Sequence, residues 1–339
     1  MYLKLIKETK EEIVKNKDYP FYTYISLSNI CNANCVFCDV KQNKDKKCAI
    51  NIYELIDELS NMGTKYIHFT GGGEPFINDD IMMYIKYCTK KDINVNIISN
   101  GLNITEEKIK NLKDEKINAV FFSIDSHISS IHDKLRGIDG LWDKVTSNIN
   151  LVKKYLPKVK IVLNHVLNKE NISDFDKYIS MKDIFDFDYI NPIIIKDCKQ
   201  LFFSNDQIEN YNKNLEFYYK LAKSKNIQFF ADNIDFFNKK VSNNGDRDVN
   251  TTMRCIYPTL CAFVDAPSGG VYPCDCSIHR DKEIFKIGNL KEEKFIDIWN
   301  GYKRLSLKEK LLNSELNCKL KCDEANCKFN DYILGSDFK

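Results

Sequence analysis

An alternation of two residue patterns constrains the fold of this chain most strongly. Between residues 22 and 195, short runs rich in β-branched and aromatic residues alternate with longer amphipathic stretches. The short runs predict six strands, at Tyr22 to Leu27, Tyr66 to Thr70, Val95 to Ser99, Ala119 to Ile124, Lys160 to His165 and Phe187 to Ile195. The amphipathic stretches predict helices at Ile52 to Met62, Ile81 to Lys90, Glu106 to Leu112, Trp142 to Tyr155 and Ile172 to Met181, with Asp80 and Thr105 as caps.

Repeated βα units of this kind build a parallel sheet, which makes the fold class α/β. Six units fall short of the eight that close a complete barrel, so we predict a partial (β/α)6 barrel of the TIM type, open on one side.

The domain boundaries follow from the same pattern. We expect residues 1–20 to form a helical N-terminal extension and residues 21–200 to form the barrel. Residues 201–250 predict a helical linker, with a helix over 206–225 and a polar stretch at 241–250. Residues 251–339 hold seven of the 13 cysteines and predict a small cysteine-rich domain.

Charge and hydropathy exclude several partners. Lys+Arg number 50 against 48 Asp+Glu, so the formal net charge of +2 gives no bulk attraction to nucleic acid or membranes. The first ten residues are charged throughout, and no apolar run reaches the roughly 18 residues that span a bilayer. We therefore expect a cytoplasmic protein, in whose reducing surroundings clustered cysteines bind metal or do chemistry.

Three cysteines follow the first predicted strand at short spacing: Cys31, Cys35 and Cys38. A [4Fe–4S] centre normally has four thiolate ligands, so three of them leave one iron without a protein thiolate. That iron can coordinate a substrate, as the open position of a catalytic zinc site does. A zinc knuckle completed by a distant histidine is the alternative.

Polar residues end the next three predicted strands. These residues are Gly71, Gly72, Gly73, Glu74 and Pro75 after the second strand, Ser99 and Asn100 after the third, and Ser123 and Asp125 after the fourth. The carboxyl ends of parallel strands meet on one face, where barrel enzymes assemble their sites, so these loops are expected to share a pocket with the cysteines. Glycines there would let the backbone approach a small ligand closely.

The cysteine spacing and the Gly-Gly-Glu-Pro loop resemble the signature of the radical S-adenosylmethionine (SAM) superfamily. This resemblance implies that the three cysteines bind a [4Fe–4S] cluster whose open iron chelates SAM, and that the polar loops hold the methionine and ribose. It implies that one electron, from a donor such as flavodoxin or ferredoxin, releases a 5′-deoxyadenosyl radical that takes a hydrogen atom from the substrate.

The segment from His127 to Gly137 resembles the Asp…His-Asp…Arg-Gly stretch of subfamilies with auxiliary clusters. Arg136 is predicted to grip a carboxylate of SAM or substrate in bidentate fashion, or otherwise to serve in a surface ion pair. His132 and Asp133 are expected to organise the loop locally rather than to act as acid and base.

The cysteine-rich tail resembles the SPASM/twitch extension of the same superfamily, which implies at least one auxiliary [4Fe–4S] cluster. A β-hairpin turning at Gly269 and Gly270 would bring Cys255 and Cys274 together, with Cys318 and Cys322 completing the site. Cys261, Cys276 and Cys327 remain for a second, incompletely coordinated cluster. A zinc-ribbon stabiliser is the alternative.

An auxiliary cluster that accepts an electron from the substrate radical favours oxidation. With about twenty residues before the first strand, we expect no leader-peptide domain and a small-molecule substrate such as a carbohydrate. A peptide or protein substrate, delivered by a partner protein, is an alternative, as is epimerisation with Cys198 as hydrogen-atom donor. A hypothesis of another class is a non-catalytic iron–sulfur or zinc-binding module.

Overall fold

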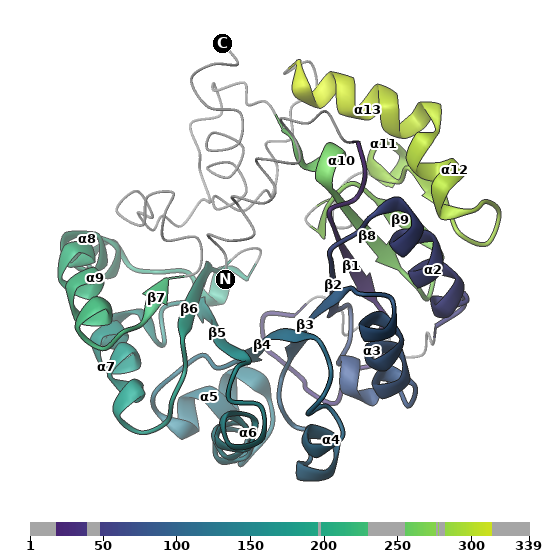
Figure 1. Cartoon of the computed structure of the whole chain (residues 1–339). Helices are drawn as coiled ribbons and strands as arrows, with labels where there is room; N and C mark the ends of the chain where they lie inside the picture. The colour runs from purple at the N-terminus through teal and green to yellow at the C-terminus, as the bar shows by residue number, and fades with distance from the viewer. Residues whose placement is uncertain are drawn as a thin grey trace. The chain divides into compact units, whose positions relative to one another are not determined.

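A computed structural model of the chain describes residues 18–38, 48–195, 198–229, 255–275, 277 and 282–313 (Figure 1). The expected N-terminal helix and the polar stretch at 241–250 lie outside these residues. So do four predicted cluster ligands, Cys276, Cys318, Cys322 and Cys327. Within the described ranges no helix has the length and apolar character needed to cross a membrane.

The described chain is an α/β protein with a mostly parallel sheet, as predicted. Its strands are β1 (Tyr22–Ser26), β2 (Tyr66–Thr70), β3 (Asn94–Ser99), β4 (Ile117–Ser123), β5 (Lys160–Leu167), β6 (Tyr189–Ile194), β7 (Gln228–Phe229), β8 (Cys261–Asp265), β9 (Gly270–Tyr272) and β10 (Gly288–Asn289). Its α-helices are α2 (Ile52–Met62), α3 (Ile81–Lys90), α4 (Glu106–Lys110), α5 (Ser129–Arg136), α6 (Leu141–Tyr155), α7 (Phe175–Ser180), α8 (Asn205–Lys213), α9 (Leu215–Ser224), α10 (Tyr257–Leu260), α11 (Lys282–Phe285), α12 (Phe295–Asn300) and α13 (Tyr302–Leu312). Short 3-10 helices lie at η2 (Pro75–Ile77), η3 (Ile172–Asp174), η4 (Met181–Asp183) and η5 (Lys199–Leu201).

Two compact units make up the chain. The first contains the described residues up to 30, those from 48 to 96 and those from 255 onward. Its strand order is β10-β9-β8-β1-β2, with β1 parallel to both β2 and β8 and with β9 antiparallel to its neighbours. Ile25 pairs with Phe69 on one side and Val264 on the other, and all three side chains are fully buried. A strand of the cysteine-rich region therefore belongs to the same sheet as the first barrel strand.

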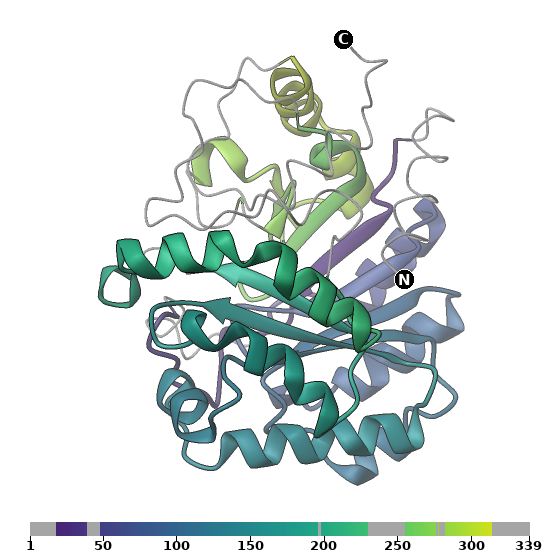
Figure 2. The same cartoon turned by 90° about the vertical axis from the view of Figure 1, so that its left-hand side faces the viewer.

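The second unit contains residues 31–38 and the described residues from 97 to 229. Its strands β4, β5, β6 and β7 are all parallel, and Figure 2 shows helices of this unit lying alongside its own strands. Helix α7 packs on β5 through aromatic contacts, because the rings of Phe175 and Tyr178 lie 5.6 Å and 3.9 Å from the His165 ring. Strand β3 runs from the first unit into the second.

The six predicted strands are confirmed with ends shifted by at most two residues, and α2 and α3 have the predicted bounds. The predicted helix over 206–225 is wrong as a single element, because Asn214 separates α8 from α9. Its side-chain amide donates to the Asn210 carbonyl at 2.8 Å and so competes with the helical backbone. The helix predicted at 172–181 is divided as well, into η3, α7 and η4.

The two predicted caps differ in outcome. The Thr105 hydroxyl accepts a hydrogen bond from the Lys108 N–H and caps α4, as predicted. Asp80 occupies the N-cap position of α3 but makes no side-chain cap bond. Its backbone is already helical, at φ −87° and ψ −3°, and not extended as a capping residue usually is.

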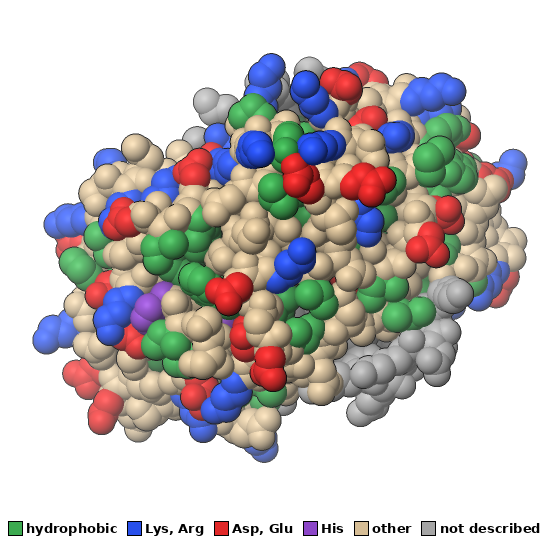
Figure 3. Space-filling model, turned by 90° about the horizontal axis from the view of Figure 1, so that it is seen from below, with side chains coloured by type: hydrophobic (Ala, Val, Ile, Leu, Met, Phe, Trp, Pro, Cys, Tyr) green, Lys and Arg blue, Asp and Glu red, His purple; other side chains and the backbone are tan. Residues whose placement is uncertain are grey.

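The surface agrees with the balanced composition. On the face shown in Figure 3, basic and acidic side chains are interspersed, with small groups of apolar side chains between them. This mixture suits a chain whose formal net charge is +2.

Candidate functional site

The loop that carries Cys31, Cys35 and Cys38 is fastened to the end of α5 in the second unit. The backbone N–H groups of Asn34 and Val36 donate to the carbonyls of Arg136 and Leu135, at 3.0 and 2.9 Å. Gly137 ends α5 in the left-handed conformation (φ +67°), and a Cβ there would come within 2.5 Å of the Asn34 carbonyl oxygen. The Arg-Gly pair noted in the sequence therefore shapes the cysteine loop.

Hydrogen-bond donors lie close to the sulfur atoms of Cys31 and Cys35. The Ala33 N–H lies 3.4 Å from Cys31 Sγ, and the Asn100 side-chain amide lies 3.9 Å from the same atom. The Arg136 guanidinium donates to Cys35 Sγ at 3.8 Å. Cys35 is buried and Cys31 is half-buried. Such donors stabilise thiolates, which are the form of cysteine that ligates iron.

The donor set suits an iron–sulfur cluster. In the part of the chain that the structure describes, no three His, Cys, Asp or Glu side chains are grouped closely enough to hold a single metal ion. A cubane does not require such a group, because each thiolate ligates a different iron atom. Three thiolates on one loop, two of them facing N–H donors, therefore fit a [4Fe–4S] cluster.

Asparagines that sequence reasoning missed tie the cysteine loop to the segment after β3. Asn100 donates to the Asn32 side-chain oxygen at 2.8 Å, and Asn32 donates in turn to Asn103 at 3.1 Å. The predicted SAM contacts of Asn100 and Ser99 stay predictions. In this structure the Ser99 hydroxyl accepts the Gly101 N–H at 2.9 Å and thereby shapes the turn. The sequence signal for Asn32 and Asn103 was only their presence in asparagine-rich loops.

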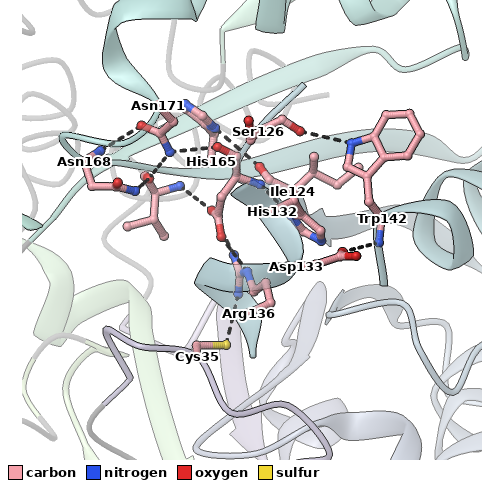
Figure 4. A network of polar contacts seen from close by, with 12 residues as sticks. Cys35, Ile124, Ser126, His132, Asp133, Arg136, Trp142, His165, Asn168 and Asn171 are labelled. Carbon is pink, nitrogen blue, oxygen red and sulfur yellow. Dashed lines mark hydrogen bonds and ion pairs between the residues drawn. The ribbon is translucent and has the colours of Figure 1, made fainter. Parts of the chain in front are cut away.

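Arg136 and Asp125 form a buried ion pair, and Figure 4 shows Arg136 in a network of polar contacts that includes Cys35. The guanidinium Nε and Nη2 donate to the two carboxylate oxygens at 2.6 and 3.0 Å. Asp125 is fully buried, and Oδ1 also accepts the Val166 N–H at 2.9 Å. In this structure the carboxylate that Arg136 binds in bidentate fashion is that of Asp125, and the predicted grip of Arg136 on SAM or substrate stays a prediction. The predicted contact of Asp125 with SAM stays a prediction.

His132 and Asp133 organise the loop locally, as predicted. The His132 Nδ1 accepts the Asp125 backbone N–H at 3.1 Å. The Asp133 carboxylate accepts the N–H groups of Gly140 and Trp142, at 2.7 and 2.9 Å, at the start of α6. Burial, aided by the Arg136 charge, lowers the pKa of His132 to about 3, so its imidazole is neutral at physiological pH.

The electrostatics of Arg136 follow from its neighbours. Burial alone would lower its pKa, but the Asp125 charge and the Cys35 thiolate outweigh burial and raise the pKa above its usual value. The guanidinium is therefore always charged, and it also lies over the Phe37 ring at 5.2 Å.

The glycine-rich loop belongs to the first unit and packs on the residues that lead into Cys31. The Gly72 N–H donates to the Ser26 hydroxyl at 2.9 Å, and the Glu74 N–H donates to the Ile30 carbonyl at 2.9 Å. A Cβ on Gly73 would come within 2.1 Å of that same carbonyl oxygen. Gly73 therefore allows close packing of one loop on another, and the predicted approach of a ligand to these glycines stays a prediction.

The remaining residues of this loop have structural partners. Glu74 is 3% exposed, and its carboxylate accepts the Phe76 N–H at 3.2 Å, so that it caps η2 with Pro75 at the first helical position. Contacts of Gly71, Gly72, Gly73, Glu74, Pro75 and Ser123 with SAM stay predictions.

Cys198 lies beside the cysteine loop within the second unit. Its sulfur is 3.9 Å from the Val36 carbonyl oxygen, and its side chain is partly exposed. The position that sequence order gave it, just beyond the sixth strand, thus brings it next to the predicted cluster ligands.

The predicted hairpin of the cysteine-rich tail is confirmed. Strands β8 and β9 are antiparallel, with Gly269 at φ +78° in the turn between them. Phe263 pairs with Tyr272 at the end of the hairpin, and the predicted approach of Cys255 to Cys274 stays a prediction. Cys255, Cys261 and Cys274 are all buried. The choice among them as ligands of one or two clusters stays a prediction.

Comparisons with known proteins agree with this site. The family model of the radical SAM superfamily matches residues 25–181, and that of an iron–sulfur cluster-binding (SPASM) domain matches residues 255–327. The chain is 23% identical to the AdoMet-dependent heme synthase of Methanosarcina barkeri over 91% of both proteins. It is 27% identical to the cysteine-type anaerobic sulfatase-maturating enzyme of Clostridium novyi, over 88% of this chain and 83% of that enzyme.

Two solved structures share the fold. SuiB of Streptococcus suis, bound to SAM, has a TM-score of 0.66 at 15% identity, over 89% of this chain and 72% of SuiB. The enzyme anSMEcpe, bound to AdoMet and a peptide, has a TM-score of 0.64 at 21% identity, over 91% of this chain and 87% of that one. These likenesses confirm the predicted partial barrel.

The two domain matches imply a SAM-binding [4Fe–4S] cluster and auxiliary iron–sulfur clusters as the cofactors. With the cysteine loop, the parallel sheet and the C-terminal hairpin in place, this chain belongs to the radical SAM superfamily and carries a SPASM domain.

Proposed function

We propose that this protein cleaves SAM reductively at a [4Fe–4S] cluster bound by Cys31, Cys35 and Cys38 and directs the resulting radical at a peptide or protein side chain. The observation that carries the first part is the cysteine loop itself, in which donors from Ala33, Asn100 and Arg136 face two of the sulfur atoms. When bound, the cluster supplies one electron, which splits SAM into methionine and a 5′-deoxyadenosyl radical.

The residues of the chain hold this centre in place. The end of α5 fixes the loop backbone, and the asparagine contacts fix its orientation relative to the end of β3. An external donor of the flavodoxin or ferredoxin type would supply the electron. Cys255, Cys261 and Cys274 would contribute to an auxiliary cluster, whose electron-accepting capacity favours net oxidation of the substrate.

The substrate class is supported by relatedness. The chain is 27% identical over most of its length to an enzyme named for maturing sulfatases, which are proteins. None of the relatives named above supports the predicted oxidation of a carbohydrate, and we do not propose it. A second relative is named as a heme synthase, so an iron porphyrin is the competing candidate for the substrate.

The cleavage test compares two cysteine variants of the full chain. Protein reconstituted without oxygen is incubated with dithionite and SAM, and iron and 5′-deoxyadenosine are measured. We expect Cys35→Ala to lose cleavage by at least about 100-fold, since removing the ligand leaves the cluster incompletely held. Cys88→Ala is the matched control, because Cys88 is buried in α3 and burial raises its pKa, which keeps it a thiol. Cleavage that survives Cys35→Ala would refute the ligand assignment.

The substrate test measures stimulation of cleavage. Cysteine- and serine-containing peptides are compared with Fe-coproporphyrin III as additives. We expect peptides to raise the 5′-deoxyadenosine yield and to change in mass. Stimulation by the porphyrin alone would replace the peptide proposal and leave the cleavage proposal intact.

A further inference from the structure

One nitrogen of the Arg136 guanidinium, Nη1, takes no part in the ion pair with Asp125. Nε and Nη2 bind the two oxygens of Asp125, at 2.6 and 3.0 Å, in the planar fork that arginine forms with a carboxylate. Nη1 lies at the far corner of the same plane, and it donates to Cys35 Sγ at 3.8 Å. One side chain thus connects a buried carboxylate with the most buried sulfur of the cysteine loop.

Asp125 cannot turn away to release Arg136. Its backbone N–H donates to His132 Nδ1 at 3.1 Å, and its carbonyl accepts from the Asn171 side chain at 2.7 Å. Its Oδ1 accepts the Val166 N–H at 2.9 Å. Contacts from α5, β5 and the loop after β5 therefore fix the carboxylate, and the carboxylate fixes the guanidinium (Figure 4).

We propose that Arg136, oriented by Asp125, is a positioning residue that sets the reduction potential of the cluster on Cys35. This inference rests on the proposed function. An N–H donor on a ligating sulfur stabilises the more negative, reduced cluster and so raises its potential. The Asp125 charge opposes this effect, because it neutralises the guanidinium at close range.

Substitutions at the two residues are expected to shift the reduction potential in opposite directions. Arg136→Lys keeps a cation for Asp125 but concentrates the charge on one nitrogen, which cannot serve the carboxylate and the sulfur together, so the potential should fall. Asp125→Asn keeps an acceptor for Arg136 and Val166 but removes the negative charge, so the potential should rise. We expect each variant to change the ratio of reduced to oxidised cluster at least about threefold at a fixed potential, or about 28 mV at 59 mV per tenfold change.

The measurement is a redox titration of the full-length reconstituted protein, followed by electron paramagnetic resonance. The cluster at Cys35 is the one whose signal responds to added SAM, and a Cys31→Ala, Cys35→Ala, Cys38→Ala variant shows the auxiliary signal alone. Tyr178→Phe is the control for loosened structure: it removes the bond from the Tyr178 hydroxyl to the Ile124 carbonyl (2.8 Å) without touching a sulfur. We expect it to lower stability and leave the potential unchanged.

The outcomes separate the inference from the proposed function. Opposite shifts in the two variants, with none in Tyr178→Phe, support the role of Arg136. Shifts of the same sign, no shift, or an equal shift in Tyr178→Phe would overturn it. If Arg136→Lys does not retain iron, the Asp125→Asn variant alone tests the inference: a higher reduction potential supports it, and a lower or unchanged potential overturns it. A wild-type protein without any SAM-responsive signal would instead refute the proposed function.

Discussion

His165 carries a buried imidazole that can become charged only at the expense of the fold. The ring is fully buried between Phe175 and Tyr178, and its Nδ1 lies 3.4 Å from the Ile124 carbonyl oxygen. That oxygen can only accept, so Nδ1 carries the proton of the neutral ring and Nε2 is left without a partner. Burial lowers the pKa of His165 to about 4.

The predicted consequence is acid sensitivity that His165→Phe removes. The unfolded chain takes up the proton near pH 6.5 and the folded chain only near pH 4, so the free energy of unfolding falls as the pH drops through this window. The slope is about 1.4 kcal/mol per pH unit, or about 3 kcal/mol in all. Urea unfolding of both proteins at pH 7.5, 6 and 5 measures the difference. Equal slopes would show that the folded protein protonates His165 freely.

Residue types near the site could be predicted from the sequence, but their partners could not. The sequence indicated that Arg136 binds a carboxylate of SAM or substrate, and it gave no sign of the ion pair with Asp125, eleven positions earlier, that the structure shows. Which anion an arginine meets depends on where α5 directs its side chain, and residue spacing does not encode that direction. The position of Cys198 beside the cysteine loop follows from the order of strand ends, and its role as a hydrogen-atom donor stays a prediction.

At the scale of elements, the glycine loop packs tightly against the backbone that follows β1. Gly73 lies against the backbone of residues 28–30, where a Cβ would meet the Ile30 and Ser28 carbonyl oxygens at 2.1 and 2.7 Å. Backbone atoms cannot swing aside as a side chain does. A methyl group there must displace the segment that leads directly into Cys31.

Gly73→Ala should therefore damage the cysteine loop as well as the glycine loop. We expect it to destabilise the protein by about 1–3 kcal/mol, the usual cost of overpacking, and to reduce SAM cleavage per chain. Gly140→Ala is the control, since a Cβ there has no neighbour within 4 Å and costs only the strain of φ +74°, about 1–2 kcal/mol. Urea unfolding and 5′-deoxyadenosine yield measure both effects. Equal loss of cleavage in the two variants would contradict the specific role of Gly73.

Whole-chain organisation is the level at which the sequence was least informative. The alternation of strands and helices predicted the barrel strands, because each unit is local in sequence. It could not predict that Cys261–Asp265 pairs in parallel with Tyr22–Ser26, since that contact joins segments far apart in the chain. Boundaries drawn on composition divided the chain at residue 251, whereas the sheet of the first unit continues across that division.

A protein cut after residue 250 should therefore fail as an independent barrel. It would expose the edge of β1, whose Thr23 and Ile25 are completely buried in the full chain, together with its unpaired backbone groups. The cut also removes Arg304, which binds both carboxylate oxygens of Asp18 just before β1, at 2.8 and 2.9 Å. We expect the truncated chain to aggregate, as measured by size-exclusion chromatography beside the full-length protein. A monomeric, cooperatively unfolding fragment that still cleaves SAM would show that the barrel does not need β8.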